Sequence, residues 1–277
     1  MPAFLALVAS VAWGLADFLG GAYSRRLPTA LVMVWSQAAG LVGIGLVLVL
    51  GGWRPPGPYL WWGVGASAFG TLAGAFFYRA LALGTMSVVA PIAGTGLVLP
   101  VVVGVVRGER PSAVAVAGIM LAAAGVVLAS GPELRGVGVQ RTSVAYAVLA
   151  ACGFGGALAL IPRAGPDRWA MTTAALTAFS FVATLLFVLV TRPRPPPRSS
   201  PRDAGGVLAI GVLNVVALGL YAYASTRGLV AIVGVLASLY PVVTVVLAQA
   251  VYAERLRGIQ LAGVVAAFGG VVCLAAG

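Results

Sequence analysis

Ten long apolar stretches, separated by short segments that hold nearly all the charges, follow one another along this 277-residue chain. A transmembrane helix needs about 20 consecutive apolar residues, and each stretch reaches that length. Only 8% of the residues are charged, whereas a soluble domain carries roughly 25%. We therefore predict an all-α membrane protein with ten transmembrane helices. The stretches cover roughly residues 3–22, 29–51, 59–83, 86–106, 111–130, 142–162, 168–191, 204–227, 229–251 and 256–276.

The net charge of +11 comes from arginine, because the chain contains no lysine. These arginines lie almost wholly between the apolar stretches, where they can meet anionic lipid headgroups. Nucleic-acid binding needs basic residues gathered on a folded, water-facing surface, and the sequence offers no such surface. The expected partners are the lipid bilayer and a small molecule, with no nucleic acid, and the protein is expected to be a monomer or a homodimer.

Patterns for catalysis, metal binding and nucleotide binding are missing from the sequence. Without histidine or lysine, the chain cannot build a Ser/His or Ser/Lys dyad or a histidine metal site. It also lacks the G-x-x-x-x-G-K loop of nucleotide-driven pumps. Cys152 and Cys273 each lie inside an apolar stretch, which is typical of small buried residues. We expect no enzyme activity, no metal and no cofactor.

The chain also repeats itself, because segment 78–130 matches segment 222–277 at nearly one offset. An odd number of helices per repeat makes the second half enter the membrane from the opposite side. Secondary transporters use such inverted repeats and place their site near the midplane between the halves. We predict two inverted five-helix repeats, 1–130 and 142–277, in a single membrane domain. Gly84 aligns with Gly228 at an offset of 144, and Glu109, Gly118 and Gly125 align with Glu254, Gly263 and Gly270 at 145.

Three segments carry a resemblance to a known family. They are the Trp13-Gly14 pair, "GERPSAVAVAGIMLAAAGVVL" at 108–128, and "YPVVTVVLAQAVYAERLRGIQLAGVVAAFGGVV" at 240–272. The pattern resembles the drug/metabolite transporter superfamily, and within it the EamA-type ten-helix transporters. This resemblance implies a multi-pass transporter of the cytoplasmic membrane. It covers essentially the whole chain, but the first repeat departs from the pattern by placing its prolines at Pro91 and Pro100.

The orientation of the chain receives two conflicting signals. The resemblance implies that both termini lie in the cytoplasm. In that orientation the cytoplasmic loops would hold six of the 17 arginines and the opposite loops the other eleven. Because positive charge normally gathers in cytoplasmic loops, the arginine distribution argues against the orientation that the family implies. The two signals leave the orientation open.

The first apolar stretch carries a carboxylate, Asp17, in the segment "WGLADFLGG". At 100° per residue its small and polar residues share one arc of about 120°. This face should look into the helix bundle while the bulky residues meet lipid or other helices. The residues of this face are Ser10, Trp13, Gly14, Asp17, Gly20, Gly21 and Ser24.

Four further stretches segregate their polar residues in the same way. We predict that two of these stripes line a cavity, the one that carries Tyr78 and the one that carries Asn214 and Tyr221. The polar atoms of these side chains need hydrogen-bond partners in a helix bundle that excludes water. The stripe in the seventh stretch is interpreted as close helix packing. The stripes are Gly63, Ser67, Thr71, Gly74 and Tyr78; Thr173, Thr177, Ser180 and Thr184; Gly211, Asn214, Tyr221 and Ser225; and Ser238, Pro241, Gln249 and Tyr252.

A carboxylate deep in a membrane span costs about 2.5–3.5 kcal/mol on insertion scales, so it normally faces a cavity or a partner. Asp17 could hold a cationic substrate, with Trp13, Tyr78 or Tyr221 supplying cation–π faces. It could instead accept the proton that couples transport to a proton gradient. It could also pair with Arg79, which should lie at a similar depth, or extend to the interface.

Two other groups of residues mark helix ends and breaks. Pro91 and Pro100, with the glycines between them, predict an irregular fourth stretch whose freed carbonyls could face a substrate path, and Pro241 is the corresponding candidate in the second half. Glu109 and Glu254 end spans beside arginines and are predicted to form interfacial ion pairs.

The sequence therefore favours a secondary transporter that moves a small neutral or cationic metabolite, such as an amino acid, an amine or a drug-like compound, by alternating access. The alternative is a lipid-linked carrier or flippase of the same fold. The predicted substrate-binding or coupling residues are Trp13, Asp17, Tyr78, Arg79, Asn214, Tyr221 and Ser238, and the predicted helix-break or gating residues are Pro91, Pro100 and Pro241.

Overall fold

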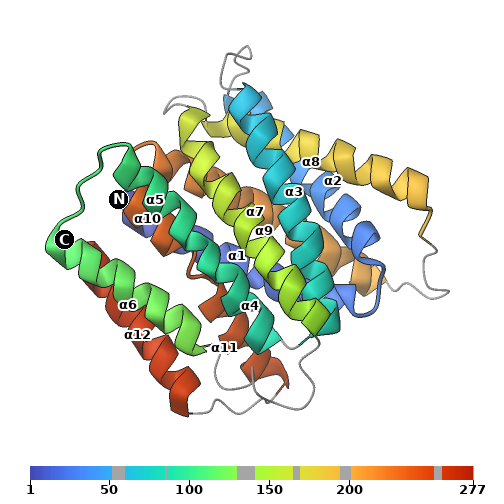
Figure 1. Cartoon of the computed structure of the whole chain (residues 1–277). Coiled ribbons are helices and arrows are strands. Elements are labelled where there is room, and N and C mark those ends of the chain that lie inside the picture. Colours follow the sequence, from blue (N-terminus) through green and yellow to red (C-terminus); the bar gives the residue numbers. More distant parts are fainter. Residues whose placement is uncertain are drawn as a thin grey trace.

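A computed structural model describes residues 1–51, 60–84, 86–129, 141–164, 169–193, 201–252 and 258–276. All regular secondary structure in these residues is helical (Figure 1). The helices are α1 (Pro2–Ser24), α2 (Thr29–Gly51), α3 (Leu60–Leu83), α4 (Met86–Gly94), η1 (Thr95–Leu97), α5 (Val98–Val106), α6 (Ala113–Ala129), α7 (Arg141–Leu160), η3 (Ile161–Ala164), α8 (Trp169–Thr191), α9 (Pro201–Ser225), α10 (Val230–Ala237), α11 (Tyr240–Tyr252) and α12 (Gly258–Ala276).

Seven helical segments in this part of the chain are long and apolar enough to cross a membrane. The all-α multi-pass prediction is therefore confirmed, while the count of ten spans stays a prediction. The remaining apolar stretches form shorter helices. The seven segments are Pro2–Ser24, Thr29–Gly51, Trp61–Leu83, Arg141–Arg163, Trp169–Thr191, Asp203–Ser225 and Val230–Val251.

Two of the predicted stretches are broken. Residues 86–106 form α4, a 3₁₀ turn and α5, and Pro100 lies within the first turn of α5. Residues 229–251 form α10 and α11, which meet at Ser238 and Leu239. Pro241 lies in the first turn of α11, where a proline costs least because its missing N–H would have no partner in the helix.

The helices pair across the sequence. Helix α1 packs along α9, α3 along α7, α2 along α8 and α6 along α12. In Figure 1 the pair α6 and α12 lies at one side of the bundle and the pair α2 and α8 at the opposite side. Helices α1, α3, α7 and α9 lie between these two pairs together with α4, α5, α10 and α11, so the centre of the protein is made of helices from both halves of the chain.

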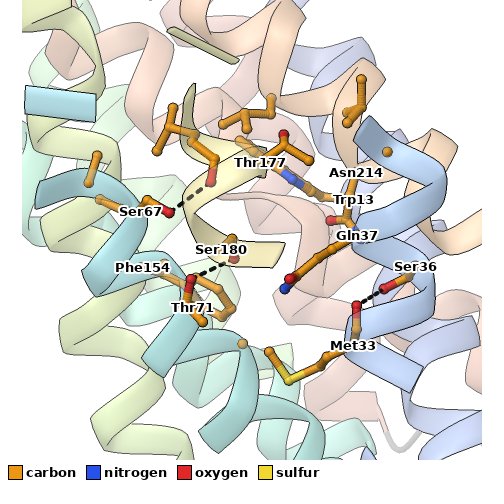
Figure 2. Close-up of a pocket in the computed structure, with 18 of the residues that line it drawn as sticks. Trp13, Met33, Ser36, Gln37, Ser67, Thr71, Phe154, Thr177, Ser180 and Asn214 are labelled. Carbon is orange, nitrogen blue, oxygen red and sulfur yellow. Dashed lines mark hydrogen bonds between the residues drawn. The ribbon is translucent and has the colours of Figure 1, made fainter. Parts of the chain in front are cut away.

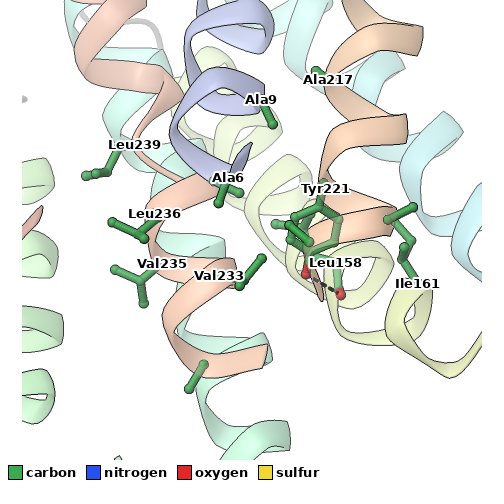
Figure 3. Packing of buried hydrophobic residues seen from close by; sticks show 14 of the residues in the cluster. Ala6, Ala9, Leu158, Ile161, Ala217, Tyr221, Val233, Val235, Leu236 and Leu239 are labelled. Carbon is green, nitrogen blue, oxygen red and sulfur yellow. Dashed lines mark hydrogen bonds between the residues drawn. The ribbon is translucent and has the colours of Figure 1, made fainter. Parts of the chain in front are cut away.

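The core between these helices is built largely from small and branched apolar residues. Figure 3 shows Ala6 and Ala9 of α1 in one cluster with Val233 and Leu236 of α10 and Tyr221 of α9. Small residues let helix backbones approach each other, and this close packing drives helix association where lipid removes the hydrophobic gain.

Candidate functional site

A cavity of about 200 Å³ lies inside the bundle. Helices α1, α2, α3, α7, α8, α9 and α11 contribute to its wall, with Ile161 at the end of α7 (Figure 2). Its described lining residues are Trp13, Asp17, Met33, Ser36, Gln37, Gly40, Ala66, Ser67, Gly70, Thr71, Gly74, Tyr78, Phe154, Ala157, Leu158, Ile161, Leu176, Thr177, Ser180, Gly211, Asn214, Val215, Leu218 and Tyr240.

Asp17 and Trp13 face this cavity from α1, as the helical projection predicts for their direction. Asp17 is only 7% exposed, and Tyr78 and Tyr240 line the same cavity, where the charge of its carboxylate acts on them. Asp17 is the one charged residue among the described residues that line the cavity. The electrostatic character of the site therefore depends on this carboxylate and on what neutralises it.

Helices α3 and α8 form a hydroxylated wall. Thr71 and Ser180 share a hydrogen bond of 2.5 Å between their hydroxyl oxygens, and Ser67 donates to the Leu176 carbonyl at 2.8 Å. The stripe of the third stretch thus reaches the cavity as predicted, at Ser67, Thr71, Gly74 and Tyr78. The stripe of the seventh stretch does more than pack helices, because Thr177 and Ser180 also line the cavity.

Of the two residues of α9 that were predicted to line a cavity, only one does so. Asn214 lines the cavity beside Tyr78 and donates from its amide to the Ile210 carbonyl at 3.0 Å. Tyr221 lies outside the lining, and its hydroxyl donates to the Leu158 carbonyl at 2.8 Å. Its ring contacts Trp13 with 5.8 Å between the ring centroids. Tyr221 therefore supports the cavity wall from behind.

Other predicted residues lie away from the cavity. Arg79 is exposed and is not among the lining residues, because it is rotated by about 100° from Tyr78 around α3. Ser238 is 1% exposed but lies in the break between α10 and α11, and Pro100 and Pro241 are buried outside the lining. Pro91 falls within α4, which contributes no described residue to the lining.

Several cavity residues escaped the sequence reasoning. Gln37 carries the only amide in the second apolar stretch, a signal that could have identified it, and Phe154 and Tyr240 carried no comparable signal. The side-chain oxygen of Gln37 and the hydroxyl of Tyr240 are buried without a hydrogen-bond partner. Figure 2 shows Gln37 extending from α2 into the space beside Thr71 and Ser180. Such orphaned polar atoms in a cavity wall are candidates for ligand contacts.

Glu109, which follows the first broken stretch, has a different role from the expected interfacial ion pair. Its two carboxylate oxygens accept hydrogen bonds from the backbone N–H groups of Val230 at 2.8 Å and Ala231 at 3.0 Å. A carboxylate at this position is favourable because helix N-termini carry positive partial charge and free N–H groups. Glu109 therefore joins the first half of the chain to the start of α10. Glu254 lies outside the described residues.

The match to protein families covers nearly the whole chain. The model of the EamA-like transporter family matches residues 1–131 and again residues 141–276. The chain belongs to the EamA-like transporter family. It is a multi-pass membrane transporter of the drug/metabolite transporter superfamily, in agreement with the resemblance that the sequence segments carry.

A solved structure, described only as the crystal structure of a protein, shares the fold of this EamA family member with a TM-score of 0.77. The match covers 98% of this chain and 95% of that chain at 20% sequence identity. A search among curated proteins finds no match. These comparisons establish the fold and the family of this chain.

Proposed function

We propose that this EamA family member is a secondary transporter of the cytoplasmic membrane that moves a small neutral or cationic metabolite by alternating access. The observation that carries the proposal is the cavity within the bundle, with Asp17 as the charged residue of its described lining. Carboxylates buried in membrane spans are rare, and they commonly mark substrate or ion pathways and proton relays.

The volume of the cavity supports a small substrate. At about 200 Å³ it is smaller than the roughly 300–1,000 Å³ of pockets that hold drug-sized ligands. An amino acid or a small amine fits this scale better than a large drug does. The charge of the lining also argues against anions, since no arginine is among the described lining residues.

The helix packing supports the two-repeat plan, with halves at 1–130 and 142–277. If α1, α2, α3 and α6 correspond to α7, α8, α9 and α12, exchanging the halves turns the α1–α9 contact into the α7–α3 contact. The pairs α2–α8 and α6–α12 then each join a helix to its counterpart. A cavity between two such related halves is the arrangement that alternating access requires.

Transport by the full chain in liposomes tests this function. Proteoliposomes preloaded with a mixture of amino acids and amines should take up the same radiolabelled compounds in exchange, while protein-free liposomes should not. Uptake that depends on an imposed pH gradient would add proton coupling to the mechanism. Exchange of no compound in the mixture, together with movement of a labelled lipid between leaflets, would contradict the proposal and favour a lipid carrier.

A further inference from the structure

We propose that the cavity selects protonated amines, with Asp17 balancing the ammonium charge and the Gln37 side-chain oxygen accepting a hydrogen bond from the ligand. This inference rests on the proposed function, because it names the substrate class of the same cavity. The ligand it describes is an ammonium compound of metabolite size with an apolar or aromatic body.

The described lining of the cavity carries one negative charge and no positive charge. Asp17 is almost fully buried, and the described lining offers no arginine to neutralise it. Arg79, which the sequence suggests as an ion-pair partner, is exposed and outside the lining. An ionised carboxylate in a low-dielectric site attracts a cation far more strongly than it would in water. A cationic ligand supplies the missing partner, whereas an anionic ligand would add a second buried negative charge.

Two polar atoms of the cavity wall lack a hydrogen-bond partner in the described structure. The Gln37 oxygen can only accept a hydrogen bond, and in the described structure it has no donor. The Tyr240 hydroxyl is likewise unpaired in a residue that is 6% exposed. The hydroxyls of Thr71 and Ser180 bond to each other, and in the described structure neither donates to the Gln37 oxygen. A ligand N–H group would satisfy the Gln37 oxygen, and this requirement separates primary amines from quaternary ammonium compounds.

Aromatic side chains form part of the cavity lining. Trp13 and Phe154 each pack edge-on against Tyr240, with centroid distances of 6.5 and 6.3 Å, and Tyr78 lies near the same carboxylate. Aromatic faces beside a carboxylate favour cations through their negative ring faces. They also give an apolar surface for the body of the ligand, which explains why a site with one carboxylate would prefer an organic amine to a metal cation.

Equilibrium binding to the purified full chain in detergent tests the proposal with four probes of one shape. The probes are 2-phenylethylammonium, its N-trimethylated analogue, 2-phenylethanol and 3-phenylpropanoate, measured by isothermal titration. The protein should bind the primary ammonium at least about tenfold more tightly than the alcohol, with the carboxylate weakest. Asp17→Asn should weaken ammonium binding by about 30-fold or more, as loss of a buried charge partner does, and leave alcohol binding unchanged.

Gln37→Leu separates the hydrogen bond from the charge. It should weaken the primary ammonium by about two- to tenfold, the value of one hydrogen bond, and leave the trimethylated analogue unaffected. Matched controls are Asp203→Asn in the first turn of α9 and Gln249→Leu in α11, both outside the lining. Both controls should bind all probes like the unmodified protein, and every variant should keep a single monodisperse gel-filtration peak.

Three results would overturn the amine site: equal binding of alcohol and ammonium, unchanged ammonium binding in Asp17→Asn, or binding of none of the four probes. The outcome of the liposome exchange experiment does not depend on the outcome of the binding experiment. A protein that exchanges neutral amino acids without preferring ammonium probes keeps the transport function and loses the amine site. A protein that binds the ammonium probes but exchanges nothing keeps the site and loses the transport function.

Discussion

The helix pairs α2–α8 and α6–α12, at opposite sides of the bundle, pack in different ways. Helices α2 and α8 meet beside the cavity and present side chains such as Gln37, Thr177 and Ser180 to it. Helices α6 and α12 meet through their backbones, because a Cβ atom added at Gly270 would lie 2.6 Å from the Ala122 amide nitrogen and 2.8 Å from the Gly118 carbonyl oxygen. The α2–α8 pair leaves a cavity between the helices that polar groups line, whereas the α6–α12 pair packs so closely that no space remains between the backbones.

One bundle thus combines a region that is packed by shape with a region whose polar groups line a cavity. Glycine and alanine give α6 and α12 a contact that depends on shape alone, which is the usual basis of helix association in lipid. The α2 and α8 side keeps polar groups that helix packing leaves unsatisfied, including the Gln37 oxygen. We therefore expect substitutions in the two regions to affect different measurements.

The largest expected effect on stability is at the α6–α12 contact. Gly270→Ala should lower the free energy of unfolding by about 2 kcal/mol, because the added methyl group overpacks a backbone contact. Gly45→Ala in α2 is the matched control, since a Cβ atom there would meet nothing within 4 Å, and it should be neutral or slightly stabilising. Unfolding midpoints in detergent measure both. Equal midpoints for the two variants would show that the α6–α12 contact does not carry the cohesion assigned to it.

Glu109 comes next in size. Glu109→Gln removes the negative charge from the α10 N-terminus while keeping one acceptor oxygen, so it should cost about 1 kcal/mol. Glu109→Asp keeps the charge on a shorter side chain and serves as the comparison. If the loss in thermal stability were the same at high and low salt and equal for both variants, the geometry of the side chain, and not its charge, would account for the effect.

Tyr221 tests the boundary of the cavity. Tyr221→Phe deletes the hydrogen bond to the Leu158 carbonyl and should lower the stability by about 1 kcal/mol. Because Tyr221 supports the cavity from behind, its loss should leave ammonium binding within about twofold, whereas Tyr240→Phe, at the lining, should change ligand binding more than stability. Isothermal titration gives the ammonium affinity of each variant, and thermal unfolding gives its stability. If Tyr221→Phe changed ligand binding more than stability and Tyr240→Phe did the opposite, Tyr221 would have to be assigned to the binding site.

The smallest expected effect is the coupling between Thr71 and Ser180. Thr71→Val, Ser180→Ala and the double variant form a cycle whose interaction energy should be about 0.6 kcal/mol, typical of hydrogen bonds between membrane helices. Chemical unfolding in mixed micelles can resolve this value. An interaction energy near zero would mean that water or the ligand replaces the bond easily, which would make these hydroxyls part of the binding surface.

The face predicted for the first helix agrees with the structure, and the face predicted for the ninth stretch does not. Both outcomes have one physical origin. A projection at 100° per residue is valid while a helix is continuous, and α1 is continuous from Pro2 to Ser24. It placed Asp17 and Trp13 on one face correctly. The ninth stretch breaks between α10 and α11, so the phase changes there. Ser238 therefore lies outside the lining, and Tyr240 faces the cavity in its place.

By itself the sequence determined that this chain is a helical membrane protein and that the Asp17 face of its first helix turns inward. Both conclusions follow from composition and helical periodicity, which are local properties. The tertiary structure alone decided which faces meet around the cavity. It brought Gln37 and Phe154 to the lining, placed Tyr221 behind it and left Arg79 outside. Helix docking depends on shape complementarity between segments distant in sequence, and no single segment encodes that information.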